Sequence, residues 1–124
     1  MIVPMIISVF LGLLIGLERQ QHHKAVGVRT MSLICLGSTL FTCMSIHFIN
    51  SDPTRIIGQI VTGIGFLGAG IIFKSGNQII GLTTAATVWC GAALGALVGL
   101  QMYPEAFIAT FLVLFINLVF KYLK

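Results

Sequence analysis

The sequence predicts an all-α integral membrane protein, a single domain built as a bundle of about five transmembrane helices. Of its 124 residues, 57% are hydrophobic and only 8% are charged, and the mean hydropathy is +1.06. A soluble domain usually carries about 25% charged residues. Five apolar segments come near the roughly 20 residues that a helix needs to cross a bilayer. They are residues 2–17, 30–49, 56–73, 79–100 and 104–122.

The first segment, residues 2–17, is interpreted as a helix of the mature protein rather than a cleaved leader. It lacks the basic n-region and the small-residue cleavage site of a secretory signal, and Glu18 and Arg19 follow it directly. A loop up to Arg29 then leads into the second segment. Charge near lipid is costly and is usually paired or functional. Glu18 is therefore expected either to form an ion pair with Arg29 or to face a polar vestibule for a cation or a partner.

The joints around the third and fourth segments carry signals for helix starts and turns. Asp52, followed by a proline, predicts the N-cap of the third helix, with Arg55 in its first turn. The run Lys74-Ser-Gly-Asn predicts a turn before the fourth helix. Residues 79–82 either continue that helix or form an irregular approach to it, with Thr83 as its cap.

The fifth segment opens at Tyr103-Pro-Glu105, where the acid lies near the positive end of the helix dipole. In the loops, Arg55 alone falls on one side of the membrane, and the positive-inside rule assigns the other side to the cytoplasm. This predicts an outside N-terminus and a cytoplasmic C-terminus. The net charge of +4 is dispersed between apolar runs and does not indicate nucleic-acid binding. The basic residues on the cytoplasmic side are Arg19, Lys24, Arg29, Lys74, Lys121 and Lys124.

Rows of small residues spaced four apart predict faces where helices pack closely in lipid. The pattern fits either packing within one chain or a homodimer face. The third helix is small on more than one side, so we expect it to lie centrally, with neighbours on two faces. The rows are Ser8, Gly12 and Gly16 in the first helix, Thr87, Gly91, Gly95 and Gly99 in the fourth, and Gly58, Thr62, Gly63, Gly65, Gly68, Ala69 and Gly70 in the third.

Several motifs suggest chemistry that their context does not support. The pattern Gly63-x-Gly65-x-x-Gly68 matches a dinucleotide fingerprint, but it lies inside a membrane segment and lacks the acid that would follow about 20 residues later. The three cysteines are expected to be free thiols within the spans. His22 and His23 belong either to a solvated basic loop or to a metal pair. No catalytic constellation is visible, so we predict neither an enzyme nor a bound cofactor.

Five short blocks occur in order along the chain and together resemble the membrane domain of the MgtC/SapB family. Many members carry a soluble C-terminal domain after the helices, so this chain is expected to be a short member or the membrane part alone. The resemblance assigns polar functional positions to Glu18, Arg19, Arg29, Thr30, Asp52, Arg55, Thr83 and Thr84. The blocks are Gly16-Leu-Glu18-Arg19, Gly27-Val-Arg29-Thr30, Asp52-Pro-Thr-Arg55, Gly63-Ile-Gly65-Phe-Leu-Gly68-Ala-Gly70 and Gly81-Leu-Thr83-Thr84-Ala-Ala-Thr87-Val-Trp89.

The resemblance implies a multi-pass protein of the bacterial inner membrane, linked to growth in low magnesium and in some members to virulence. It also implies action by binding other membrane proteins, ATP synthase among them. We therefore predict a non-enzymatic regulator that acts through intramembrane contacts. The alternative is an oligomeric magnesium or other cation transporter or channel that uses Glu18 or Asp52. In the predicted topology these two acids lie on opposite sides of the bilayer, so they could not share one metal site.

Overall fold

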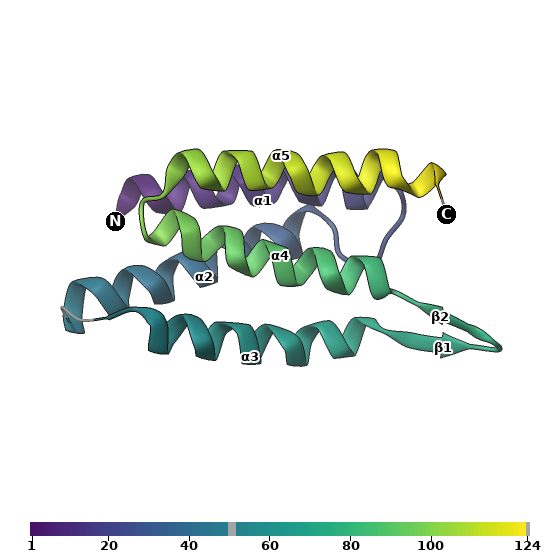
Figure 1. The fold of residues 1–124 in the computed structure, drawn as a ribbon, viewed down its shortest axis with the longest axis horizontal. Coiled ribbons are helices and arrows are strands. Elements are labelled where there is room, and N and C mark those ends of the chain that lie inside the picture. The colour runs from purple at the N-terminus through teal and green to yellow at the C-terminus, as the bar shows by residue number, and fades with distance from the viewer. Residues whose placement is uncertain (50–51, 124) are drawn as a thin grey trace.

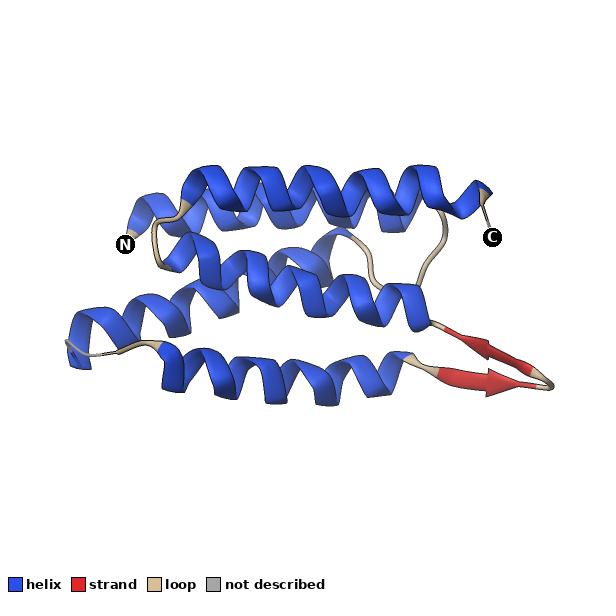
Figure 2. Ribbon diagram, in the orientation of Figure 1, coloured by secondary structure: helices blue, strands red, loops and turns tan. Residues whose placement is uncertain are grey.

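The computed structural model describes residues 1–49 and 52–123, and within them five long helices run in alternating directions (Figure 1). A short β-hairpin joins the third helix to the fourth (Figure 2). All five helices are long and apolar enough to cross a membrane, which confirms the predicted all-α membrane bundle. The elements are α1 (Ile2–Gln21), α2 (Val28–Ile49), α3 (Thr54–Ile71), β1 (Phe73–Ser75), β2 (Gln78–Ile80), α4 (Leu82–Gly99), α5 (Tyr103–Val119) and the 3-10 turn η1 (Phe120–Tyr122).

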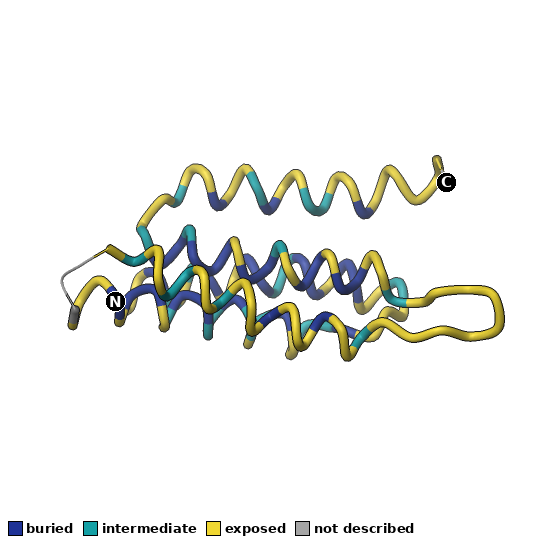
Figure 3. Tube along the Cα trace, turned by 60° about the horizontal axis from the view of Figure 1, so that its bottom comes forward, coloured by how far each residue is buried: buried dark blue, intermediate teal, exposed yellow. Residues whose placement is uncertain are grey.

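The central helix of the bundle is α4, which packs against each of the other four helices. Eleven of its 18 residues are buried, whereas α3 buries only two of its 18, Ile64 and Gly68. The prediction that the third helix lies centrally is therefore wrong. Small residues permit close approach, but they do not determine whether a neighbouring helix is present. The helix α5 is also largely exposed, with buried residues along one side only (Figure 3).

A series of side-chain hydrogen bonds fixes α2 against α4. Hydroxyl and thiol groups on α2 donate to backbone carbonyl oxygens of α4. Each of these oxygens has two lone pairs, so it can accept a second hydrogen bond besides the one within the helix. The bonds run from Cys35 to Gly91 at 3.4 Å, from Ser38 to Ala92 at 2.6 Å, from Thr39 to Gly95 at 2.7 Å and from Cys43 to Gly99 at 3.7 Å. Polar groups that would be costly in lipid are thereby satisfied inside the helix pair.

Glycines make this close approach sterically feasible. A Cβ atom on Gly95 would overlap the backbone carbonyl oxygen of Cys35 and would lie 2.7 Å from the Cβ of Ser38. On the other side of α2, a Cβ on Gly16 of α1 would lie 2.6 Å from the Cα of Val28. These small residues are required by contacts within the chain.

The first helix is longer than predicted, because it continues through Glu18 and Arg19 to Gln21 instead of ending near residue 17. Both charged residues are buried. They neutralise each other inside the bundle, so the appearance of charge in the sequence does not mark the end of the helix. The second helix begins at Val28, close to its predicted start at residue 30.

The third helix ends earlier than predicted and the fourth is shorter than predicted, because residues 73–80 form a hairpin. The third helix ends at Ile71 and the fourth begins at Leu82. Aromatic and β-branched residues favour strands, and Phe73 pairs with Ile80 in the antiparallel register. The predicted turn is confirmed at Gly76, whose φ of +63° suits the first position of a two-residue hairpin loop.

The start of α3 is stabilised by Asp52, although Pro53 occupies the N-cap position itself. A carboxylate oxygen of Asp52 accepts a hydrogen bond of 3.0 Å from the backbone N–H of Thr54. This bond lowers the pKa of Asp52 below its usual range. At the far end of the fold, Gly81 with a φ of +94° precedes α4, so Thr83 is not the cap.

Candidate functional site

A buried ion pair lies at the end of the bundle that carries Arg19, Lys24, Arg29, Lys74 and Lys121, which we call the basic end. The side chains of Glu18 and Arg19 are joined by two hydrogen bonds of 2.7 Å each, and the two residues are 5% and 3% exposed. The predicted ion pair between Glu18 and Arg29 is wrong, because Glu18 pairs with its own neighbour and Arg29 is exposed. Lys124, counted at this end from the sequence, lies outside the described residues.

Hydrogen bonds from two other helices complete this buried pair. Arg19 of α1 donates to the hydroxyl of Thr84 on α4 at 3.3 Å. The amide of Asn117 on α5 donates to Glu18 at 3.3 Å and to the hydroxyl of Thr87 at 3.1 Å. A buried charge is tolerated only when such partners are present. The cluster therefore ties α1, α4 and α5 together.

A histidine and a lysine extend the cluster to the surface. The Nδ1 atom of His22 lies 2.7 Å from the backbone oxygen of Glu18 and 3.3 Å from its carboxylate. The Nε2 atom lies 2.7 Å from the ammonium group of Lys121. An ammonium group can only donate, so Nε2 is the acceptor and the proton of the neutral ring belongs on Nδ1. Among the described residues, no group of three His, Cys, Asp or Glu gathers as a metal site here.

A pocket of about 440 Å³ opens beside this cluster at the basic end. We call it the basic pocket. Its lining combines the charged cluster with one hydroxyl residue of α4 and two apolar side chains of α5 and η1. The lining residues are Glu18, Arg19, His22, Lys24, Thr83, Ile116, Asn117, Phe120 and Lys121.

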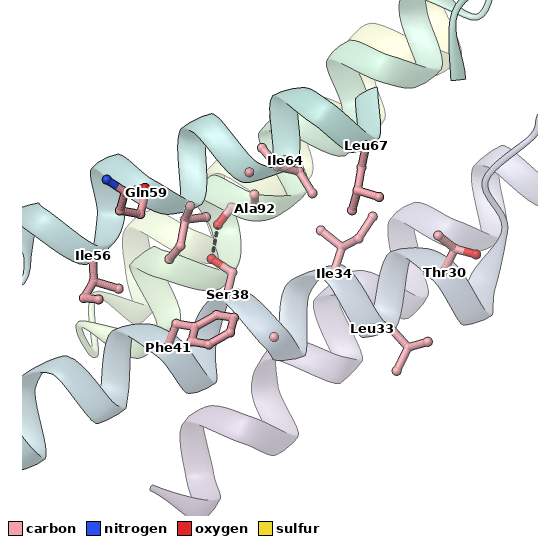
Figure 4. Close-up of a pocket in the computed structure, with 13 residues that line it drawn as sticks. Thr30, Leu33, Ile34, Ser38, Phe41, Ile56, Gln59, Ile64, Leu67 and Ala92 are labelled. Carbon is pink, nitrogen blue, oxygen red and sulfur yellow. Dashed lines mark hydrogen bonds between the residues drawn. The ribbon is translucent and has the colours of Figure 1, made fainter. Parts of the chain in front are cut away.

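A second, apolar hollow of about 620 Å³ separates α2 from α3, and we call it the α2–α3 groove. Its walls face each other in Figure 4, with Phe41 on α2 and Leu67 on α3. A Cβ atom added to Gly37 or to Gly63 would meet nothing within 4 Å, so both walls could accept a larger side chain. The complete lining is Thr30, Leu33, Ile34, Gly37, Ser38, Phe41, Ile56, Gln59, Ile60, Gly63, Ile64, Leu67 and Ala92.

The residues suggested by the sequence fall into four places. The buried cluster contains Glu18, Arg19, Thr84 and Thr87. The basic pocket is lined by Thr83, and the α2–α3 groove by Thr30 and Gly63. Asp52 and Arg55 lie at the opposite end of the bundle, so no single site contains all the predicted polar residues. Among the glycines, Gly12, Gly16, Gly91, Gly95 and Gly99 abut other helices, Gly68 approaches Ala85, and Gly65 and Gly70 have open space around them.

The sequence did not predict the roles of three residues at the basic end. His22 was expected in a solvated loop or a metal pair, and Asn117 and Lys121 were not singled out. Asn117 lies 99 positions from Glu18, and Lys121 lies 99 positions from His22. Local patterns do not predict such pairing. One signal was available for Asn117, because a side-chain amide inside an apolar span is usually bonded to a partner within the bundle.

Comparison with known proteins identifies relatives across nearly the whole chain. Residues 5–124 match the model of the MgtC family. The protein named MgtC of Brucella abortus (strain 2308) is 49% identical over 108 residues, which cover 86% of this chain and 45% of that protein. The protein named MgtC of Salmonella typhimurium (strain LT2) is 42% identical over 120 residues, which cover 97% and 52%. The chain thus spans about half the length of these relatives, and no solved structure is significantly similar to it.

Proposed function

This chain belongs to the MgtC family, and from that membership we propose that it is a regulator in the bacterial inner membrane, without enzymatic activity. It acts through contacts with other membrane proteins inside the bilayer, during adaptation to low magnesium. In bacteria that infect host cells, the same role would bear on virulence. By family resemblance, ATP synthase is the first partner to test.

The observation that carries this proposal is the α2–α3 groove. Transmembrane helices associate by close van der Waals contact, and small residues permit the closest approach. In α3, the glycines at positions 58, 63, 65 and 70 have no atom within 4 Å of an added Cβ. The glycines of α4, by contrast, are already in contact with α2. The α2–α3 groove is therefore the surface on which a partner helix can pack.

The test fills the groove without disturbing the bundle. Gly63→Leu and Gly37→Leu add volume to opposite walls of the groove, where an added Cβ has open space. We expect each variant to fold, to co-purify with at least tenfold less ATP synthase after cross-linking in membranes, and to lose support of growth in low magnesium. A tenfold loss corresponds to about 1.4 kcal/mol of association energy.

The matched control is Gly65→Leu, the same change on the same helix but outside the groove lining. It should keep both association and growth. Unchanged association in both groove variants would contradict a role for this groove, as would an equal loss in the control. The same cross-linking experiment reports homo-oligomers, since two tagged copies would be recovered together.

The alternative function is an oligomeric transporter or channel for magnesium or another cation. The buried carboxylate of Glu18 beside the basic pocket favours it, since intramembrane acids often mark ion pathways. Flux into liposomes should then fall in Glu18→Gln. The double variant Glu18→Gln/Arg19→Gln controls for the effect of an unpaired arginine. Normal flux in both variants would remove this carboxylate from any transport mechanism.

A further inference from the structure

The basic pocket holds more positive charge than its own acid can neutralise. Three of its lining residues, Arg19, Lys24 and Lys121, are cationic, and Glu18 is its only acid. Both carboxylate oxygens of Glu18 are bonded to Arg19 at 2.7 Å. Within the described part of the chain, neither lysine forms an ion pair with a carboxylate. With a neutral histidine, the pocket carries a net charge of +2.

One of these lysines is held in position before any ligand binds. The ammonium group of Lys121 donates to Nε2 of His22 at 2.7 Å, and the ring of His22 is fixed in turn by the backbone oxygen of Glu18, 2.7 Å from Nδ1. An ammonium group has three protons, so two remain for a ligand. This arrangement reduces the ordering cost that a free lysine side chain would incur on binding.

The start of α4 adds to the positive potential. Thr83, in its first turn, lines the pocket. The first turn of α4 has no side-chain cap, and the free N–H groups at a helix N-terminus attract anions. The helix end alone would not define a site. Here it coincides with the uncompensated lysines.

The other wall of the pocket is apolar and open to lipid. Ile116 and Phe120 line the pocket and are exposed. They lie at the C-terminal end of the membrane-spanning stretch of α5, which is the level of the lipid headgroups. A ligand that satisfies both walls has an anionic head and an apolar body. The positive-inside pattern of the sequence places this end in the cytoplasmic leaflet, where basic pockets between transmembrane helices bind acidic lipid headgroups.

We propose that the basic pocket binds the phosphate-bearing headgroup of an anionic phospholipid, with Lys24 and Lys121 contacting the phosphate and acyl chains lying along Ile116 and Phe120. This site is independent of the α2–α3 groove. It would make the contacts between α1, α4 and α5 depend on the composition of the surrounding membrane.

The test measures lipid retention by native mass spectrometry of the detergent-purified chain. Phosphatidylglycerol and cardiolipin are titrated alongside phosphatidylcholine, whose headgroup carries no net charge. We expect at least tenfold tighter binding of the anionic lipids. Lys24→Gln and Lys121→Gln should each weaken that binding about fivefold, and together about 30-fold, as expected for roughly 1 kcal/mol per lysine. Both residues are exposed, so the variants should fold.

The matched control is Lys74→Gln, which removes one exposed lysine from the same end of the bundle but lies outside the pocket lining. It should leave lipid binding unchanged. Equal losses in Lys74→Gln and Lys24→Gln would overturn the site, because binding would then follow overall charge. Equal binding of phosphatidylcholine would also overturn it. Inorganic phosphate forms a separate arm, and if it competes as strongly as the lipid, the ligand is a soluble phosphate and the lipid proposal is wrong.

Discussion

Glu18 and Arg19 are adjacent in sequence, and their side chains form an ion pair inside the bundle. Removing two charges from water is costly, and their mutual attraction compensates only when further hydrogen bonds are made. Thr84 and Asn117 supply those bonds from α4 and α5. The ion pair is therefore stable only in the assembled bundle, and it reports on the packing of three helices.

Replacing Glu18 by glutamine should strongly destabilise the protein. Arg19 would remain as a buried cation without a counter-charge, and breaking a buried pair in this way typically costs about 3–5 kcal/mol. Thermal unfolding in detergent micelles, followed by circular dichroism, would measure the loss.

The matched control for this change is Arg29→Gln, which removes a charge from an exposed position next to the same loop. It should alter stability by no more than about 0.5 kcal/mol. The double variant Glu18→Gln/Arg19→Gln should recover part of the loss. If Arg29→Gln were as destabilising as Glu18→Gln, the pairing described here would be incorrect.

At the scale of single residues, the sequence indicated the important acid, Glu18, but not the residues that surround it. Glu18 stands out because charge is rare at the edge of an apolar span. An ion pair with Arg29 was one of the two arrangements expected for Glu18, and it is wrong because Glu18 pairs with Arg19. The true arrangement depends on Asn117 and Lys121, which lie 99 positions from Glu18 and His22, their respective partners. Local spacing does not encode contacts of this kind.

At the scale of the elements, the apolar runs located all five helices, while their ends depended on contacts that the runs do not contain. Burial of an ion pair extends α1, and strand pairing of Phe73 with Ile80 ends α3 at Ile71. The glycines of α1 and α4 lie in contact with α2, whereas most glycines of α3 face open space. Both kinds of row look alike in the sequence, because what differs is the neighbour and not the residue.

This difference predicts opposite effects of the same substitution on two helices. Gly95→Ala places a methyl group against the backbone of Cys35 and the side chain of Ser38, so it should destabilise the protein by about 1–3 kcal/mol through overpacking. Gly65→Ala meets nothing within 4 Å and should be neutral or stabilising by up to about 1 kcal/mol. Thermal unfolding of both variants in the same detergent checks the pair, and equal effects would contradict the assignment of α4 as the central helix.

The whole molecule has two ends that differ in charge. The hairpin, the loop between α1 and α2, and the end of α5 lie together at the basic end, while the first turn of α5 lies at the other (Figure 1). The five candidate spans of the described residues predict that residues 1 and 123 lie on opposite sides of the bilayer. The charge distribution predicts that the basic end faces the cytoplasm.

Labelling of single introduced cysteines tests this orientation. Asn77→Cys at the hairpin tip should react with a membrane-impermeant maleimide in inverted vesicles but not in intact spheroplasts. Glu105→Cys in the first turn of α5 should show the reverse pattern. The native cysteines lie within the membrane helices, where a charged reagent does not reach. Labelling of both sites from the same side would contradict the topology.

The bonds between α2 and α4 give the native thiols a further use. Cys35 and Cys43 each point their sulfur at a carbonyl oxygen in the seam between the two helices, whereas Cys90 is only half-buried. Cys35 has no exposed surface, so a small lipid-soluble alkylating reagent can reach its thiol only when α2 and α4 separate. The rate at which Cys35 is modified therefore measures how often the two helices open, with Cys90 as the internal reference, and the protein can be followed in a native membrane without any added label.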